Sequence, residues 1–196
     1  MYALSLDLSS KLGSVALFSG ETLIAESSLS QEFKHCEEIV PVIDGLLSQA
    51  GIELFQVSNL LCTHGPGSFT GLRIALTTLK AFSLVTKAPI QSFHTAEIRA
   101  MAWLEHQKTR PSKVVVFTQM AQSSFLASSF LVHTEALEHV EDEIVPSIPA
   151  DALDVPPCSA TLLGRFFRMA QLKNVATDVD QLISLSPLYF GSARFN

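Results

Sequence analysis

Short apolar or alternating runs occupy the first thirty residues and predict three β-strands. The runs extend over Tyr2 to Asp7, Ser14 to Ser19 and Leu23 to Leu29. Turns at Lys11-Leu12-Gly13 and Ser19-Gly20-Glu21-Thr22 separate them, and strands joined by such short turns form an antiparallel meander. We therefore expect the chain to begin with three antiparallel strands.

After residue 35 the hydrophobic spacing changes to the three-to-four-residue repeat of a helix. The first helix is predicted from Cys36 to Ala50, with Gly51 as its C-terminal stop. A strand (60–63), a second helix (72–86), a further strand (89–93) and a third helix (95–105) follow in that order. The series β-β-β-α-β-α-β, with an aspartate at the end of its first strand, is typical of the actin-like, ribonuclease H-like α/β fold.

The second half of the chain has fewer clear elements. Strands are predicted from Val114 to Phe117 and from Phe125 to Val132, and a helix from Leu162 to Ala170, with prolines in the loops between them. We therefore expect two subdomains. Residues 1–100 would form the N-terminal actin-like subdomain, and residues 101–196 a shortened C-terminal subdomain.

A glycine-rich segment, His64 to Arg73, joins the strand over 60–63 to the helix that follows. Such a turn points free backbone N–H groups at an anion or a partner chain, and Ser68 or Thr70 is placed to cap the helix. The glycine spacing does not match the dinucleotide fingerprint, and a P-loop would need a lysine where this chain has Leu72. The loop is therefore not expected to hold phosphate in either of these ways.

Composition limits the class of protein. Hydrophobic residues make up 47% of the chain and charged residues 16%, which predicts surface that stays apolar until a partner covers it. The formal net charge of −6 argues against a freestanding nucleic-acid binder. The odd number of cysteines, the lack of a signal peptide and the polar residues within the helix over 72–86 predict a cytoplasmic protein without a membrane span.

Four motifs follow one another along the chain: Asp7-Leu8-Ser9, His35 opening a helix with Pro41 and Asp44, the segment Gly65 to Arg73, and Pro187-Leu188-Tyr189. Taken together they resemble one family, TsaB (also called YeaZ), which takes part in tRNA threonylcarbamoyladenosine synthesis. The resemblance is strong over residues 1 to about 100. It implies an actin-like fold and a non-catalytic protein that dimerises with TsaD, the paralogue that transfers the threonylcarbamoyl group, while the ATPase TsaE joins them and tRNA is reached only through the complex.

A degenerate nucleotide site is predicted where actin-like ATPases keep their first phosphate hairpin. Its candidate residues are Asp7, Ser9, Ser10, Gly65 and Gly67. A working hairpin commonly has glycine directly after the aspartate, whereas this chain has Leu8, and the second phosphate loop is missing. ATPase chemistry is therefore not expected. ATP or ADP bound at the seam with the partner is the remaining cofactor hypothesis.

The two helices over 36–50 and 72–86 are the candidate partner interface. The second of them has two apolar stripes, one with Leu72 and Leu79 and another with Ile74, Ala81 and Val85, so it is either a central buried helix or one that also meets a partner. The resemblance favours the interface, with a TsaD-like paralogue or a second copy of this chain as the partner. The candidate interface residues are His35, Ile39, Ile43, Leu46, Arg73, Leu76, Leu79 and Lys80.

No catalytic residue or metal site is predicted. A metal ligand at His35 would need a second ligand on the same helical face, and only Glu38 stands at that spacing. Ser68 lacks the spacing of a hydrolase nucleophile, and His64 and His94 are interpreted as structural histidines near strand ends. The alternatives are a divergent actin-like phosphotransferase, a metallopeptidase-like enzyme and a homodimeric scaffold.

Overall fold

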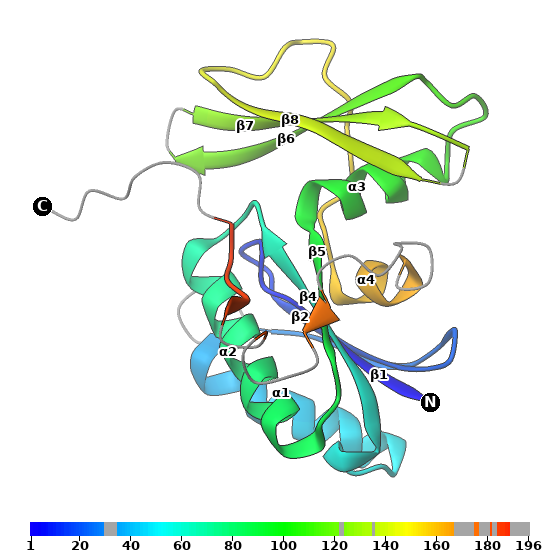
Figure 1. Ribbon diagram of the computed structural model, residues 1–196, viewed down its shortest axis with the longest axis vertical. Coiled ribbons are helices and arrows are strands. Elements are labelled where there is room, and N and C mark those ends of the chain that lie inside the picture. The colour runs from blue at the N-terminus through cyan, green and yellow to red at the C-terminus, as the bar shows by residue number, and fades with distance from the viewer. Residues whose placement is uncertain are drawn as a thin grey trace, which may run out of the picture.

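The structure is a computed structural model that describes residues 1–29, 35–121, 124–134, 136–166, 175–176, 181 and 184–188. A six-stranded mixed sheet forms the lower layer of the molecule in Figure 1. The strand order is β3-β2-β1-β4-β5-β9. Strands β1, β2 and β3 are antiparallel, β4 and β5 run parallel to β1, and β9 is antiparallel to β5. Their bounds are β1 Tyr2–Asp7, β2 Ser14–Ser19, β3 Thr22–Ser28, β4 Val57–Gly65, β5 Ile90–His94 and β9 Val175–Ala176.

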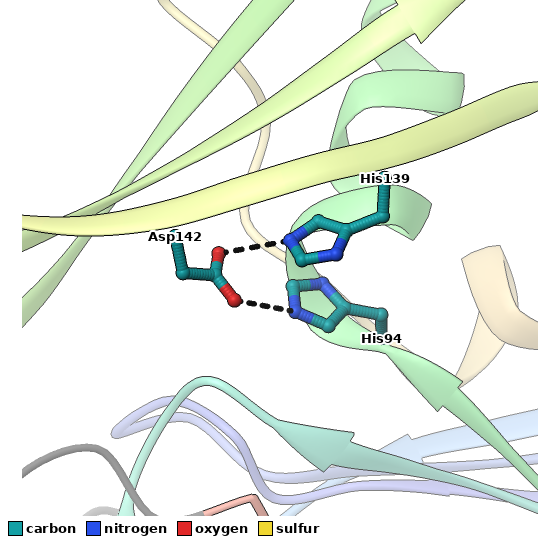
Figure 2. Close-up of side chains that lie close together, drawn as sticks. All are labelled: His94, His139 and Asp142. Atoms are coloured by element: carbon teal, nitrogen blue, oxygen red, sulfur yellow. Dashed lines mark ion pairs between the residues drawn. The ribbon is translucent and has the colours of Figure 1, made fainter.

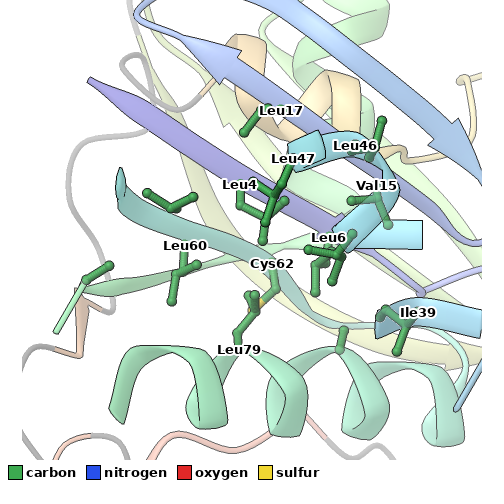
Figure 3. Packing of buried hydrophobic residues seen from close by; sticks show 14 of the residues in the cluster. Leu4, Leu6, Val15, Leu17, Ile39, Leu46, Leu47, Leu60, Cys62 and Leu79 are labelled. Carbon is green, nitrogen blue, oxygen red and sulfur yellow. The ribbon is translucent and has the colours of Figure 1, made fainter. Parts of the chain in front are cut away.

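Helices cover both faces of this sheet. Helices α1 (His35–Ala50) and α2 (Phe69–Thr86) lie on one face, and α3 (Thr95–Leu104) and α4 (Ala160–Phe166) on the other, while the short 3-10 helix η1 (Leu54–Gln56) leads into β4. Successive strand side chains point to opposite faces, so Leu4 and Leu6 pack under α1 and α2 while Ala3 joins the opposite cluster. Figure 3 shows the first cluster, in which Leu79 of α2 meets Cys62 of β4. The sheet is therefore buried on both sides.

A second sheet of three antiparallel strands lies beyond α3, at the top of Figure 1. It contains β6 (Lys113–Ala121), β7 (Ser124–Val132) and β8 (Leu137–Val145) in that order. Half-buried Arg99 of α3 connects this sheet to the lower layer through hydrogen bonds of its side chain. Its Nε donates to the Pro156 carbonyl oxygen at 3.0 Å, and its Nη1 donates to the Phe117 carbonyl oxygen at 3.0 Å and to Thr118 Oγ1 at 3.3 Å.

After the second sheet the chain returns to the first. Ser5 Oγ of β1 donates to the Ala160 carbonyl oxygen at 2.6 Å, and the Ala160 N–H donates to Ser14 Oγ of β2 at 2.9 Å. Gly164 lies against the Phe18 ring, which a Cβ at this position would overlap. Residues beyond 100 therefore contribute to both sheets.

The actin-like, ribonuclease H-like fold is confirmed by the central strand order and directions. Apart from the short η1, the order of strands and helices from β1 to β5 agrees with the sequence prediction, and Gly51 ends α1 with a φ of +67°. Strand β8 was not predicted, because its sequence is rich in acidic residues, which are depleted in strands. The predicted helix from Leu162 begins two residues earlier, at Ala160, and its last positions, 167–170, lie outside the described residues. In the described part of the chain, no helix has both the length and the apolar character needed to cross a membrane.

Replacing Arg99 with alanine is expected to lower the free energy of unfolding by about 3 kcal/mol, because hydrogen bonds from a charged donor contribute about 1.5–3 kcal/mol each. The variant leaves the carbonyl oxygens of Phe117 and Pro156 without this donor. The matched control is Arg110→Ala, since exposed Arg110 donates to the Thr134 carbonyl oxygen at 2.7 Å. The control should change the free energy by only about 0.5 kcal/mol, as is usual at the surface. Urea denaturation compares the two, and equal losses would contradict the role assigned to Arg99.

Candidate functional site

The glycine-rich loop connects the end of β4 to the start of α2. Ser68 is the N-cap residue of α2, because its Oγ accepts a hydrogen bond from the Gly71 N–H at 3.2 Å. Its carbonyl oxygen accepts from the Leu72 N–H at 2.9 Å. The predicted cap is thus confirmed at Ser68, while Thr70 is exposed within the first turn.

The loop packs directly against the segment that follows β1. The Ser68 N–H donates to the Ser9 carbonyl oxygen at 2.7 Å, and a Cβ on Gly67 would lie 2.5 Å from that same oxygen. A Cβ on Gly71 would overlap the carbonyl oxygen of Leu8. Gly67 and Gly71 are therefore required by close backbone approach. Gly65, by contrast, has a φ of +119°, which favours glycine.

The structure brings together Asp7, Ser9 and Gly67 of the predicted nucleotide site, but the two loops touch each other. Leu8, at the position expected for glycine, points into the core and is fully buried. Ser10 lies apart on the exposed turn, where its Oγ donates to the Leu12 carbonyl oxygen at 3.0 Å. The loops therefore meet through backbone contacts where a phosphate hairpin would surround its ligand.

Asp7 is a fully buried carboxyl group at the end of β1. Its Oδ1 accepts from Thr63 Oγ1 at 2.8 Å and from the Ser9 N–H at 3.2 Å, and within the described residues Oδ2 has no hydrogen bond. Burial raises the pKa of Asp7, although its hydrogen bonds with Ser9 and Thr63 act in the opposite direction. The side chain is thus enclosed by the protein and does not face solvent.

The raised pKa of Asp7 predicts a pH dependence of stability. The folded state holds this proton more tightly than the unfolded state, so stability is favoured at low pH and falls as pH rises from about 4 through the folded pKa. Asp7→Asn keeps an oxygen for Thr63 but does not titrate, and should become more stable relative to the parent as pH rises. Urea denaturation of both proteins at pH 4 to 8 tests this, with exposed Asp154→Asn as the control. A parent–variant difference that stays constant with pH would contradict the prediction.

The segment near the C-terminus also reaches the glycine-rich loop. The Leu188 N–H donates to the carbonyl oxygen of His64 at 2.7 Å, and the Leu188 carbonyl oxygen would lie 3.3 Å from a Cβ on Gly65. Pro187 beside it is buried. The glycine-rich loop and the motif Pro187-Leu188-Tyr189, which are far apart in the sequence, are thus in contact. Tyr189 itself lies outside the described residues.

The apolar residues predicted for the interface lie in the core of the chain itself, which corrects their placement at a surface. Each is at most 4% exposed and packs between the helices and the sheet: Ile39, Ile43, Leu46, Leu76 and Leu79. Of the other candidates, Arg73 is exposed, Lys80 is half-buried and the side chain of His35 lies outside the described residues. The sequence showed two apolar stripes on α2 but not which of them faces the sheet.

The outer sides of α1 and α2 carry a different set of hydrophobic side chains. Val85 of the second stripe is 75% exposed, Leu84 50% and Val40 of α1 51%. Arg73 stacks over the ring of exposed Phe69, with its guanidinium carbon 5.2 Å from the ring centroid. This cation–π contact explains a cation in the first turn of a helix, where the dipole disfavours it.

A cluster of titratable side chains between the two sheets was not predicted from the sequence. It contains His94 at the end of β5 with His139 and Asp142 on β8, and each residue offers a ligand atom within 4.8 Å of the other two (Figure 2). His64 lies next to His94, with 5.9 Å between the ring centroids. Burial lowers the pKa of His64 and of His94 to about 4, so both rings are neutral near pH 7. The cluster could not be found from spacing, because two of its members lie on the unpredicted strand.

The known proteins that this chain resembles have names from tRNA threonylcarbamoyladenosine synthesis. The family model for TsaD, tRNA N6-adenosine threonylcarbamoyltransferase, matches residues 22–156. The tRNA threonylcarbamoyladenosine biosynthesis protein TsaB of Escherichia coli (strain K12) is 31% identical over 111 residues, 56% of this chain and 48% of that protein. TsaB of Buchnera aphidicola (subsp. Acyrthosiphon pisum) is 30% identical over 119 residues, 61% of this chain and 53% of that protein. The chain spans about half the length of the curated relatives it matches.

Solved structures show the same fold over nearly the full length. The structure of YeaZ from Pseudomonas aeruginosa superposes with a TM-score of 0.72 and covers 96% of this chain and 99% of that chain, at 18% sequence identity. At this level of identity the likeness establishes the fold. The sequence matches carry the family relationship.

Proposed function

Because the chain belongs to the TsaB (YeaZ) family of tRNA threonylcarbamoyladenosine biosynthesis proteins, we propose that it serves that pathway as the non-catalytic partner of a TsaD-like transferase. The observation that carries the proposal is the match of residues 22–156 to the transferase family together with curated relatives named TsaB. A chain that shares its fold with the transferase can dock on it through matching elements, as related subunits commonly do.

The geometry around β1 supports a non-catalytic role. Backbone N–H groups are the donors that bind phosphate, whereas here the N–H of Ser68 is already bonded to the Ser9 carbonyl oxygen at 2.7 Å. The carboxyl group of Asp7 is fully buried and held by Thr63. A catalytic aspartate would need access to a substrate or a metal ion.

The outer face of α1 and α2 supports a docking role. These two helices lie side by side on the lower layer in Figure 1, and Val40, Leu84 and Val85 are half or more exposed on them. Large hydrophobic side chains that are exposed on two neighbouring helices are consistent with a protein–protein contact there. The net charge of −6 is consistent with the RNA being held by another subunit.

Reconstitution with a TsaD-like protein and a TsaE-like ATPase tests the proposal. Threonylcarbamoyl transfer to tRNA should require this chain, and the chain alone should neither hydrolyse ATP nor cleave peptides. Copurification from its own cells should recover the TsaD-like protein. Transfer that proceeds equally well without the chain would overturn the proposal.

The same experiment separates the alternatives. A chain that forms only homodimers and does not bind the TsaD-like protein would be a homodimeric scaffold. ATP hydrolysis by the isolated chain would indicate a phosphotransferase-like enzyme, and peptide cleavage a metallopeptidase-like one. Repeating the binding measurement with and without ATP or ADP tests the prediction that a nucleotide binds at the seam with the partner.

A further inference from the structure

Three side chains from two different sheets converge between β5 and β8. Asp142 Oδ2 lies 3.8 Å from His94 Nε2, and Asp142 Oδ1 lies 3.1 Å from His139 Nε2. The two histidine rings are 5.0 Å apart between centroids and inclined at 33°. Figure 2 shows one carboxylate facing both imidazoles, so three possible ligand atoms surround one point.

Three polar atoms of this cluster, on His94 and Asp142, are buried without a hydrogen bond in the described part of the chain, while the side chain of His139 is 39% exposed. Both ring nitrogens of His94 are in this state, although the residue is only 8% exposed. Asp142 Oδ1 also lacks a hydrogen bond, although it lies 3.1 Å from His139 Nε2 in an ion-pair contact. Buried polar atoms normally have a partner, since leaving one unpaired costs about 1–3 kcal/mol. A bound cation would supply that partner to His94 and Asp142, and His139 is close enough to be its third ligand.

The donor set and spacing fit a first-row transition metal ion. Two imidazoles and one carboxylate are a common set for Zn²⁺, whose bonds of about 2.0–2.2 Å place neighbouring ligand atoms roughly 3.3 Å apart. The present separations reach 4.8 Å at most, so small side-chain rotations suffice to close the site. Three protein ligands leave the fourth tetrahedral position for water or another small ligand.

The geometry points to a divalent metal site, formed by His94, His139 and Asp142, that binds one Zn²⁺ or a similar ion per chain. The ion joins the end of β5 in the first sheet to β8 in the second. Its binding therefore stabilises the arrangement of the two sheets, in addition to the hydrogen bonds of Arg99. The site is a property of the isolated chain and does not depend on the proposed partner.

Metal titration of the chelator-treated protein tests this proposal. Isothermal titration with Zn²⁺ should show one ion per chain, and Co²⁺ should produce the visible absorption of a tetrahedral site. Added Zn²⁺ should raise the melting temperature, because an ion that binds only the folded state stabilises it. His139→Asn and Asp142→Asn should each weaken binding by about 100-fold or more, since even residues one step removed from a metal commonly change its affinity 10–100-fold.

Control variants show whether metal binding is specific to His94, His139 and Asp142. His133 forms an exposed pair with Glu138 at 2.9 Å, and His133→Asn should leave metal binding unchanged. The measurements are repeated in a Cys36→Ser background, because Cys36 is an exposed thiol that could bind metal. Melting curves without metal establish that the variants fold, which is expected at His139 because its side chain is 39% exposed. Failure of the chelator-treated parent to take up metal, or equal binding by the parent and both ligand variants, would overturn the proposal.

Discussion

Replacing Gly71 with alanine is expected to lower the free energy of unfolding by about 3 kcal/mol or more, at the upper end of the cost of overpacking. The added Cβ would overlap the carbonyl oxygen of Leu8, which is a backbone atom next to buried β1. A flexible side chain could turn away, but here either the start of α2 or the end of β1 must shift. Urea denaturation measures the loss.

Gly45 provides the matched control for this substitution. It lies within α1, and a Cβ there would meet nothing within 4 Å. Gly45→Ala should therefore stabilise the protein by about 0.5–1 kcal/mol, the usual difference between the two residues in a helix. If Gly71→Ala proves as stable as the parent, the direct packing of the two loops is wrong.

Introducing a charge at Val85 is expected to weaken binding of the proposed TsaD-like partner by about 30-fold or more, because an interface residue of high energetic importance contributes about 2 kcal/mol or more. Val85→Asp and Leu84→Asp change side chains that are 75% and 50% exposed, so folding should be retained. Affinity is measured by titration against the partner. Circular dichroism and a thermal melt of each variant check the fold.

The control for the interface prediction lies on the second sheet. Ile144 of β8 is 57% exposed, and Ile144→Asp should leave partner binding unchanged. If the folded Val85 and Leu84 variants bind as tightly as the parent, the outer face of α1 and α2 is not the docking surface. If Ile144→Asp alone weakens binding, the partner contacts the second sheet instead.

The elements of the first hundred residues could be predicted because each depends on local spacing. Alternation marks β2, a helical repeat marks α1, and a serine before the apolar run marks the start of α2. The order of strands in the sheet could not be derived in this way. It depends on which distant segments pair, as in the contact between β9 and β5.

The candidate site was predicted only in part, for reasons that particular residues illustrate. The glycine-rich segment was predicted as a turn, but a sequence cannot distinguish a glycine needed for a positive φ from one needed for a close approach to Ser9 or Leu8. Leu76 and Val85 are both apolar residues of α2, and only the sheet beneath the helix determines that the first is buried and the second exposed. The histidine cluster combines β5 with a strand whose acidic sequence does not read as a strand.

The acidic composition of β8 has a consequence for how the protein behaves in a crowded solution. In the described part of the chain β8 is an outer strand of its sheet, and an unpaired strand edge is a template on which another copy can add a strand and begin to aggregate. A second copy aligned there would bring its own carboxylates against those of Glu138, Glu141 and Glu143. Charge repulsion between the two sets of carboxylates thus protects this edge from fibre-like growth.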